Sequence, residues 1–149
     1  MTINGLPLHP LVVHAAVVFA PLAGLLAIGY AVPRWRYHLR WPLLAVGVLA
    51  ALFVWLAAAT GDSLAHATSG EMATNPALAK AIHHHEDLAG KLQASTWVLA
   101  ALALGAWWTH HRPGWWRTAL LVLLPASGVA ALVLVVLTGD AGARAVWIN

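Results

Sequence analysis

Cysteine is absent from the 149 residues, and charged residues are scarce. Without thiolates the chain cannot form disulfides, zinc–thiolate sites or iron–sulfur clusters, so histidine and carboxylate remain as candidate ligands. Charged residues make up 9% of the chain and apolar residues 61%, whereas a soluble domain carries roughly a quarter charged residues. The composition therefore indicates a membrane protein.

Four stretches are long and apolar enough to cross a bilayer, which takes about 20 residues. Backbone groups in lipid must be hydrogen-bonded within their own segment, so each stretch is predicted to be a helix rather than a strand. The first stretch lacks a basic leader and is too long for the apolar region of a cleaved signal peptide. We therefore expect an all-α fold: one polytopic membrane domain, residues 1–149, with four transmembrane helices in a bundle. The predicted spans are residues 10–32, 42–60, 88–109 and 117–138.

Basic residues gather in two of the links between spans. Arg34, Arg36 and Arg40 lie in the first link, and Arg112 and Arg117 lie in the last. By the positive-inside tendency these links are cytoplasmic, which places both termini outside. All five acidic residues then lie outside as well: Asp62, Glu71, Glu86, Asp87 and Asp140.

The basic pI of about 10.0 follows from this topology rather than from a nucleic-acid-binding surface. No stripe of lysine or arginine alternates with exposed aromatic residues, as a groove for a nucleic-acid backbone would need. We expect a multi-pass protein of the bacterial cytoplasmic (inner) membrane. Its expected partners are the lipid bilayer and other membrane or respiratory-chain subunits, not nucleic acid.

A short sequence recurs at the ends of the second and fourth spans, as Thr60-Gly61-Asp62 and Thr138-Gly139-Asp140. One interpretation is a repeat of two parallel helical hairpins. Another is a C-terminal stop, in which glycine allows the left-handed turn that ends a helix. The two interpretations are compatible. Residues 61–75 then form an external loop, and Pro76 opens a third helix that projects beyond the lipid.

Six of the nine histidines share the outer end with the acidic residues: His9, His14, His66, His83, His84 and His85. His14 lies one turn inside an apolar span, where an ionisable residue usually faces the bundle interior and marks a functional site. The alternative for His14 is a neutral interfacial histidine bonded to one carbonyl. His66 follows Asp62 by four residues, so one further helical turn would let it donate to that carboxylate.

The three consecutive histidines separate by helical position. Residues three and four apart share a helix face, so His85 continues into Leu92 through an apolar face, while His83 continues into Glu86. His85 is therefore the predicted inward ligand, with His84 next. His83 is predicted to be solvated.

Two chemistries suit this cluster. A b-type haem could be ligated by His14 and His85 on facing helices, with His9 and His84 as further candidates. A Zn, Cu or Fe ion is the alternative, because imidazole and carboxylate are acceptable ligands for each. The predicted metal ligands are His9, His14, His85, Asp62 and Asp140.

A third possibility is a structural subunit that binds no ligand and packs against a larger membrane complex. No nucleophile–base pair or phosphate-binding loop stands out, so the protein is not expected to be an enzyme by itself.

The opening stretch Ile3-Asn4-Gly5-Leu6-Pro7-Leu8-His9-Pro10-Leu11-Val12-Val13-His14 resembles the start of a bacterial family of small four-span membrane proteins of unknown function. The closing stretch from Thr138 to Trp147 is similar to its C-terminal pattern. Family members often carry histidine where Asp140 stands, which argues against a haem ligand at that position here. Relatives occur fused or adjacent to haem-containing modules, so the resemblance implies a redox-linked role by association rather than by mechanism.

Overall fold

The computed structural model describes residues 2–3, 6–112 and 114–147, and helix dominates these residues, as predicted. Two strands of two residues each, β1 (Thr2–Ile3) and β2 (Leu6–Pro7), pair antiparallel before the first helix. The helices are α1 (Leu8–Gly29), α2 (Arg36–Ala67), α3 (Ser69–Thr74), α4 (Pro76–Thr109) and α5 (Trp115–Val146).

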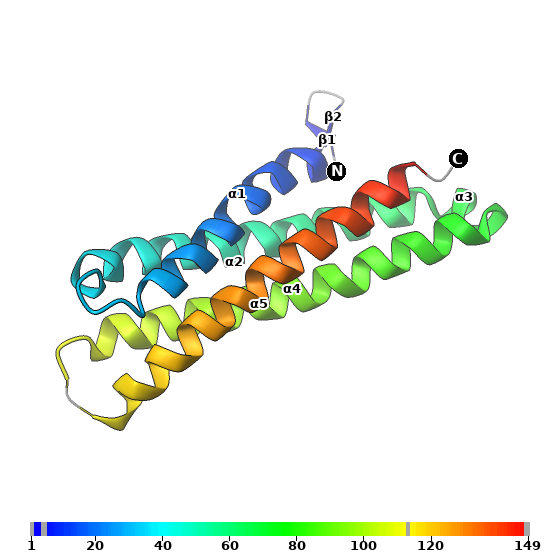
Figure 1. Ribbon diagram of the computed structural model, residues 1–149. Helices are drawn as coiled ribbons and strands as arrows, with labels where there is room; N and C mark the ends of the chain where they lie inside the picture. Colours follow the sequence, from blue (N-terminus) through cyan, green and yellow to red (C-terminus); the bar gives the residue numbers. More distant parts are fainter. Residues whose placement is uncertain (1, 4–5, 113, 148–149) are drawn as a thin grey trace.

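The four long helices form an antiparallel bundle of two hairpins, α1–α2 and α4–α5 (Figure 1). Helix α1 also packs on α5, and α2 packs on α4, so α1 and α4 are diagonal to each other. The links within the two hairpins lie together at one end, and both termini lie at the other (Figure 1). We call these the basic end, residues 30–41 and 107–117, and the histidine end, which holds His9 and His85.

The interior of the bundle is rich in alanine, with Leu43, Leu99 and Leu124 also buried, whereas many large apolar side chains are exposed. Ala20, Ala23 and Ala27 of α1 are completely buried, whereas Val18 and Val136 are 60% and 68% exposed. Small interior residues let membrane helices approach closely, and an apolar exterior is suited to lipid. Each of the four long helices is also long and apolar enough to span a membrane.

Helices α1 and α5 approach most closely at two glycines. A Cβ added to Gly24 would lie 2.8 Å from the carbonyl oxygen of Gly128, and one added to Gly128 would lie 2.6 Å from that of Gly24. Both distances are too short for real contacts, and both involve rigid backbone. This crossing therefore requires glycine in both helices.

The two hairpins bury equivalent positions. In the first helix of each hairpin the matching positions are 76 residues apart (16 and 92, for example): Ala16, Ala20, Ala23 and Ala27 correspond to Leu92, Thr96, Leu99 and Ala103. In the second helices they are 81 residues apart (43 and 124, for example): Leu43, Gly47 and Ala50 correspond to Leu124, Gly128 and Ala131. This pattern supports a repeat of two hairpins.

Neither Thr-Gly-Asp sequence ends a helix, so their interpretation as stops is wrong. Helix α2 continues to Ala67 and α5 to Val146. One internal glycine costs only about 1 kcal/mol relative to alanine, and the residues that follow are good enough helix formers to carry the helix on. The predicted external loop at residues 61–75 is wrong for the same reason, since it contains the end of α2 and all of α3.

Helix α4 begins at Pro76, as predicted. The side chain of Asn75 accepts a hydrogen bond from the backbone N–H of Leu78 at 3.1 Å, which caps the helix. Proline tolerates the first helical position because its missing N–H would have no partner there. The cap places the first turns of α4, which carry the histidine run, at the histidine end.

Candidate functional site at the histidine end

His9 ties α1 to α2. Its Nδ1–H donates to the carbonyl oxygen of Ala57 at 2.9 Å, and Nδ1 also lies 3.3 Å from the hydroxyl of Thr60. The ring lies against the α2 backbone at Gly61, where an added Cβ would be 3.1 Å from His9 Cε1. Glycine at this position therefore makes room for the imidazole.

His85 ties α4 to α5 in the same way. Its Nδ1–H donates to the carbonyl oxygen of Thr138 at 3.0 Å. The ring lies against Gly142, where an added Cβ would be 3.0 Å from His85 Cε1. His85 is half-buried, so the prediction that it faces inward is confirmed.

The two histidines occupy equivalent places in the repeat. His9 and His85 are 76 residues apart, and the two glycines under their rings, Gly61 and Gly142, are 81 residues apart. These are the offsets that relate the buried positions of the two hairpins. The two Thr-Gly-Asp sequences are 78 residues apart (60 and 138), which differs from the offset of 81 between the second helices. The two histidine sites therefore occupy equivalent positions in the repeat, and the two Thr-Gly-Asp sequences do not.

Both histidines present the same nitrogen for further binding. A carbonyl oxygen can only accept, so each Nδ1 carries the proton and each Nε2 of the neutral ring keeps its lone pair. Histidines that ligate metals usually donate their other N–H to such an acceptor, which fixes the tautomer and the ring orientation. His9 and His85 are thus both prepared as ligands through Nε2.

Two further observations concern the space around this pair. The helix segments that carry His9 and His85 lie at the same end of the bundle, on the diagonal helices α1 and α4. The hydroxyl oxygen of Thr138 is buried and has no hydrogen-bond partner among the residues that the structure describes. A buried hydroxyl without a partner is costly, so a bound water or ligand group would be favoured there.

His14 faces away from this pair. Its side chain is exposed, and its Nδ1 hydrogen-bonds to the carbonyl of Pro10 on its own helix. The expectation that His14 faces the bundle interior is therefore wrong. The alternative interpretation of His14, an interfacial histidine bonded to one carbonyl, agrees with this contact.

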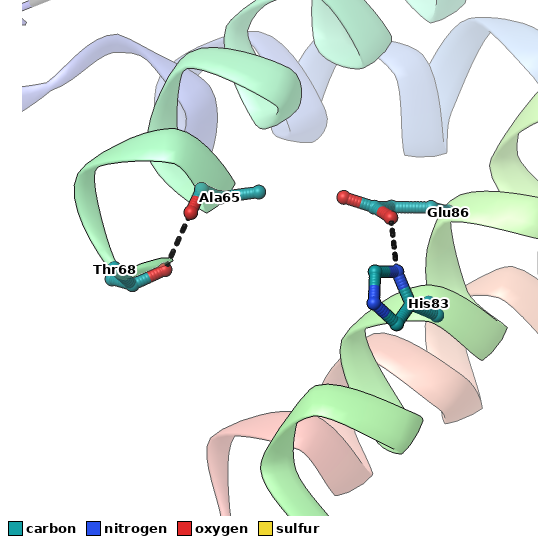
Figure 2. Close-up of polar contacts among 4 residues, drawn as sticks. All are labelled: Ala65, Thr68, His83 and Glu86. Atoms are coloured by element: carbon teal, nitrogen blue, oxygen red, sulfur yellow. Dashed lines mark hydrogen bonds and ion pairs between the residues drawn. The ribbon is translucent and has the colours of Figure 1, made fainter. Parts of the chain in front are cut away.

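The remaining candidates lie on exposed faces. His83 bonds Glu86 of its own helix at 3.1 Å (Figure 2), and His84 is also exposed. Asp140 pairs with Arg144 at 2.8 Å. Asp62 and His66 are exposed on the last turns of α2.

The structure does not assemble the predicted five-residue metal site. Within residues 2–3, 6–112 and 114–147, no group of three or more histidine, aspartate and glutamate side chains is placed to hold a metal ion. The structure instead shows two histidines at the same end of the bundle, each bonded to the second helix of its own hairpin.

Sequence reasoning missed the partners of His9 and His85, which are backbone carbonyls and glycines. A signal for His9 was present in the seven-residue spacing of His9, Ala16 and Ala23, which lie on one face of α1. His85, Leu92, Leu99 and Ala106 repeat that spacing in α4.

Four membrane-length helices with small interior side chains and an apolar exterior define a four-span integral membrane protein. The chain belongs to the family of predicted membrane proteins designated DUF2231, whose model matches residues 5–149. This match confirms the resemblance carried by the opening and closing motifs. No curated protein and no solved structure matches the chain.

At the opposite, basic end, the hydroxyl of Tyr30 lies 3.2 Å from His110 Nδ1, beside a cavity of about 150 Å³. Burial lowers the pKa of His110 below its ordinary value of 6.5, and neighbouring positive charges lower it further. Neutral His110 can accept the tyrosine hydrogen bond. The charged or titratable neighbours are Tyr30, His111, Arg40, Arg117 and Arg36.

The lowered pKa of His110 predicts that the protein loses stability as the pH falls through 6.5. Between that value and the lower folded pKa, the unfolded chain binds the proton more readily than the folded protein, so acidification favours unfolding. Denaturant unfolding in detergent on either side of pH 6.5 measures this. The variant His110→Gln should show a smaller dependence on pH. An unchanged dependence would assign the effect to other histidines.

Proposed function

We propose that the protein binds a b-type haem through His9 and His85 and acts as a redox-linked accessory protein of the bacterial cytoplasmic membrane. The observation that carries the proposal is the equivalent pair of imidazoles, each with Nδ1–H donated to a backbone carbonyl and Nε2 left as a ligand. Haem iron can be held by two axial side chains, whereas a closed zinc site needs four ligands. The two-histidine donor set therefore suits haem better than a structural metal ion.

The chain's own residues have distinct parts in this proposal. His9 and His85 would hold the haem through Nε2, and the carbonyls of Ala57 and Thr138 hold the two rings in one tautomer. The unpartnered hydroxyl of Thr138 offers a buried polar contact. A haem held in this way supplies one-electron transfer near one membrane face.

The proposed orientation places the histidine end outside the cytoplasm. Five arginines lie at the basic end, while all five acidic residues lie in the segments toward the histidine end. The positive-inside tendency assigns the basic end to the cytoplasmic side. The histidines would then exchange electrons with partners on the outer face.

The test is a visible absorption spectrum of detergent-purified protein from haem-replete cells, oxidised and then reduced with dithionite. We expect a sharp reduced Soret band and α-band typical of two imidazole ligands. A flat spectrum would refute haem binding, and metal analysis of the same sample would test the second candidate, a Zn, Cu or Fe ion on the same two histidines. A sample without haem and without metal would favour the ligand-free structural subunit.

A further inference from the structure

A hollow of about 340 Å³ opens on the surface at the basic end, between the start of α2 and the end of α4. The start of α2 and the end of α4 lie at the opposite end of the bundle from the start of α1 (Figure 1), so the hollow is independent of the proposed haem site. Its lining combines cationic and indole side chains: Arg40, Trp41, Trp107, Trp108, His111 and Arg112.

No acidic residue lies close in sequence to the two arginines of this hollow. The nearest acidic residues in sequence are Asp62, twenty-two residues after Arg40 (40 to 62), and Asp87, twenty-five residues before Arg112 (87 to 112). Both lie toward the histidine end. An anion from outside the protein is therefore the natural partner of the two arginines.

The donors in the hollow are held in place before any ligand arrives. Arg40 donates from Nη1 to His111 Nε2 at 2.8 Å, and its guanidinium lies 4.6 Å from the centre of the Tyr37 ring. Because His111 Nε2 accepts, its Nδ1 carries a proton and is a further donor. Arg40 Nε is buried and has no hydrogen-bond partner in the described part of the chain.

The tryptophans indicate the level in the membrane at which the hollow lies. Trp41 and Trp107 pack edge to face at 5.2 Å, and Trp41 and Trp108 are 55% and 61% exposed. Indole rings at the ends of membrane spans favour the level of the lipid headgroups. The arginines of the hollow thus lie where phospholipid phosphates lie, with apolar ring surface beside them.

The neighbouring cavity lined by Tyr30 and Arg36 is less suited to an anion. Arg36 already donates from Nε to the carbonyl of Tyr30 at 3.2 Å and from Nη2 to that of Ala31 at 2.9 Å. Its guanidinium is therefore engaged in closing the end of α1.

We propose that the hollow between α2 and α4 binds the phosphate of an anionic phospholipid through Arg40 and Arg112, with the tryptophans contacting the lipid's glycerol and upper acyl region. Basic pockets between membrane helices are known to hold anionic headgroups, and arginine suits phosphate through its several donors. The open, indole-lined shape favours a lipid over free phosphate.

The test compares phosphatidylglycerol with phosphatidylcholine of the same acyl chains, bound to the detergent-solubilised full chain and measured by native mass spectrometry. We expect tighter binding of phosphatidylglycerol. Arg40→Gln and Arg112→Gln should each weaken that binding about fivefold, from the usual contribution of one basic residue at an anionic surface. Arg112 is exposed beyond the end of α4, so Arg112→Gln tests the site even if Arg40→Gln folds poorly.

The matched control is Arg34→Gln. Arg34 lies at the same end and over a tryptophan ring, at 5.8 Å from Trp35 compared with 5.6 Å for Arg112 and Trp108, but it does not line the hollow. We expect Arg34→Gln to leave binding unchanged. An equal loss in Arg34→Gln would overturn the site in favour of diffuse surface charge, and displacement of the lipid by inorganic phosphate at comparable concentration would overturn the lipid assignment.

Discussion

Replacing Gly128 with leucine is expected to force α5 away from α1 and to lower the free energy of unfolding by about 3 kcal/mol or more. A Cβ at position 128 would lie 2.6 Å from the carbonyl oxygen of Gly24 and 3.1 Å from Ala27 Cβ. The first of these atoms is backbone in the middle of a helix, so it cannot move aside as a side chain can. The strain must instead separate the two hairpins.

Unfolding in detergent by a denaturing surfactant, followed by circular dichroism, measures this effect. The matched control is Gly139→Leu on the same helix, where an added Cβ would meet no atom within 4 Å. That variant should be neutral or up to about 1 kcal/mol more stable, because leucine is the better helix former. Equal losses in the two variants would show that the α1–α5 crossing is not the cause.

Removing either His9 or His85 is expected to abolish the low-spin haem spectrum of the proposed site. In that proposal each histidine would hold the haem through one nitrogen, so His9→Ala and His85→Ala should each lose the two-imidazole α-band almost completely. His14→Ala should keep it, since His14 is exposed and bonded to its own helix through Pro10. Absorption spectra of the three reduced variants, normalised to protein, provide the measurement.

A loss of haem through misfolding can be separated from the loss of a ligand. Free imidazole added to His85→Ala should restore the low-spin spectrum if only the axial nitrogen is missing. Loss of the spectrum in His14→Ala with retention in His9→Ala would reverse the ligand assignment. If the wild-type protein is colourless and both variants are less stable, the two histidines serve to hold neighbouring helices together through hydrogen bonds.

The membrane fold was predictable because its signals run along the chain. Apolar length, scarce charge and the arginines of two links are properties of segments, and each is recognised without knowledge of distant contacts. The ends of the helices were less predictable. Gly61 is compatible both with a stop and with a helix that continues, and the helix formers that follow it carry α2 on to Ala67.

The candidate site was only partly predictable. His85 was correctly placed inward because the apolar positions that follow it in α4 define one face. His14 was preferred to His9 as the predicted functional residue because it lies deeper in the first span. Depth in the membrane does not determine the direction in which a side chain points around the helix axis. The two residues are five positions apart, or about 140° around a helix of 3.6 residues per turn, so they cannot face the same neighbour.

The sequence by itself determined that this protein spans a membrane with four helices. It also determined that five of the six arginines lie at one end, and that all five acidic residues and six of the nine histidines lie toward the other. These features depend on local composition and on spacing along the chain. The tertiary structure decided which histidines face a neighbouring helix, because helix rotation is set by the packing of Ala16, Ala20 and Ala23 and by the Gly24–Gly128 crossing. It also decided which groups accept the histidine hydrogen bonds, namely the carbonyls of Ala57 and Thr138. These carbonyls lie about 50 residues away in sequence, and because every residue has a backbone carbonyl, no side chain marks them as acceptors.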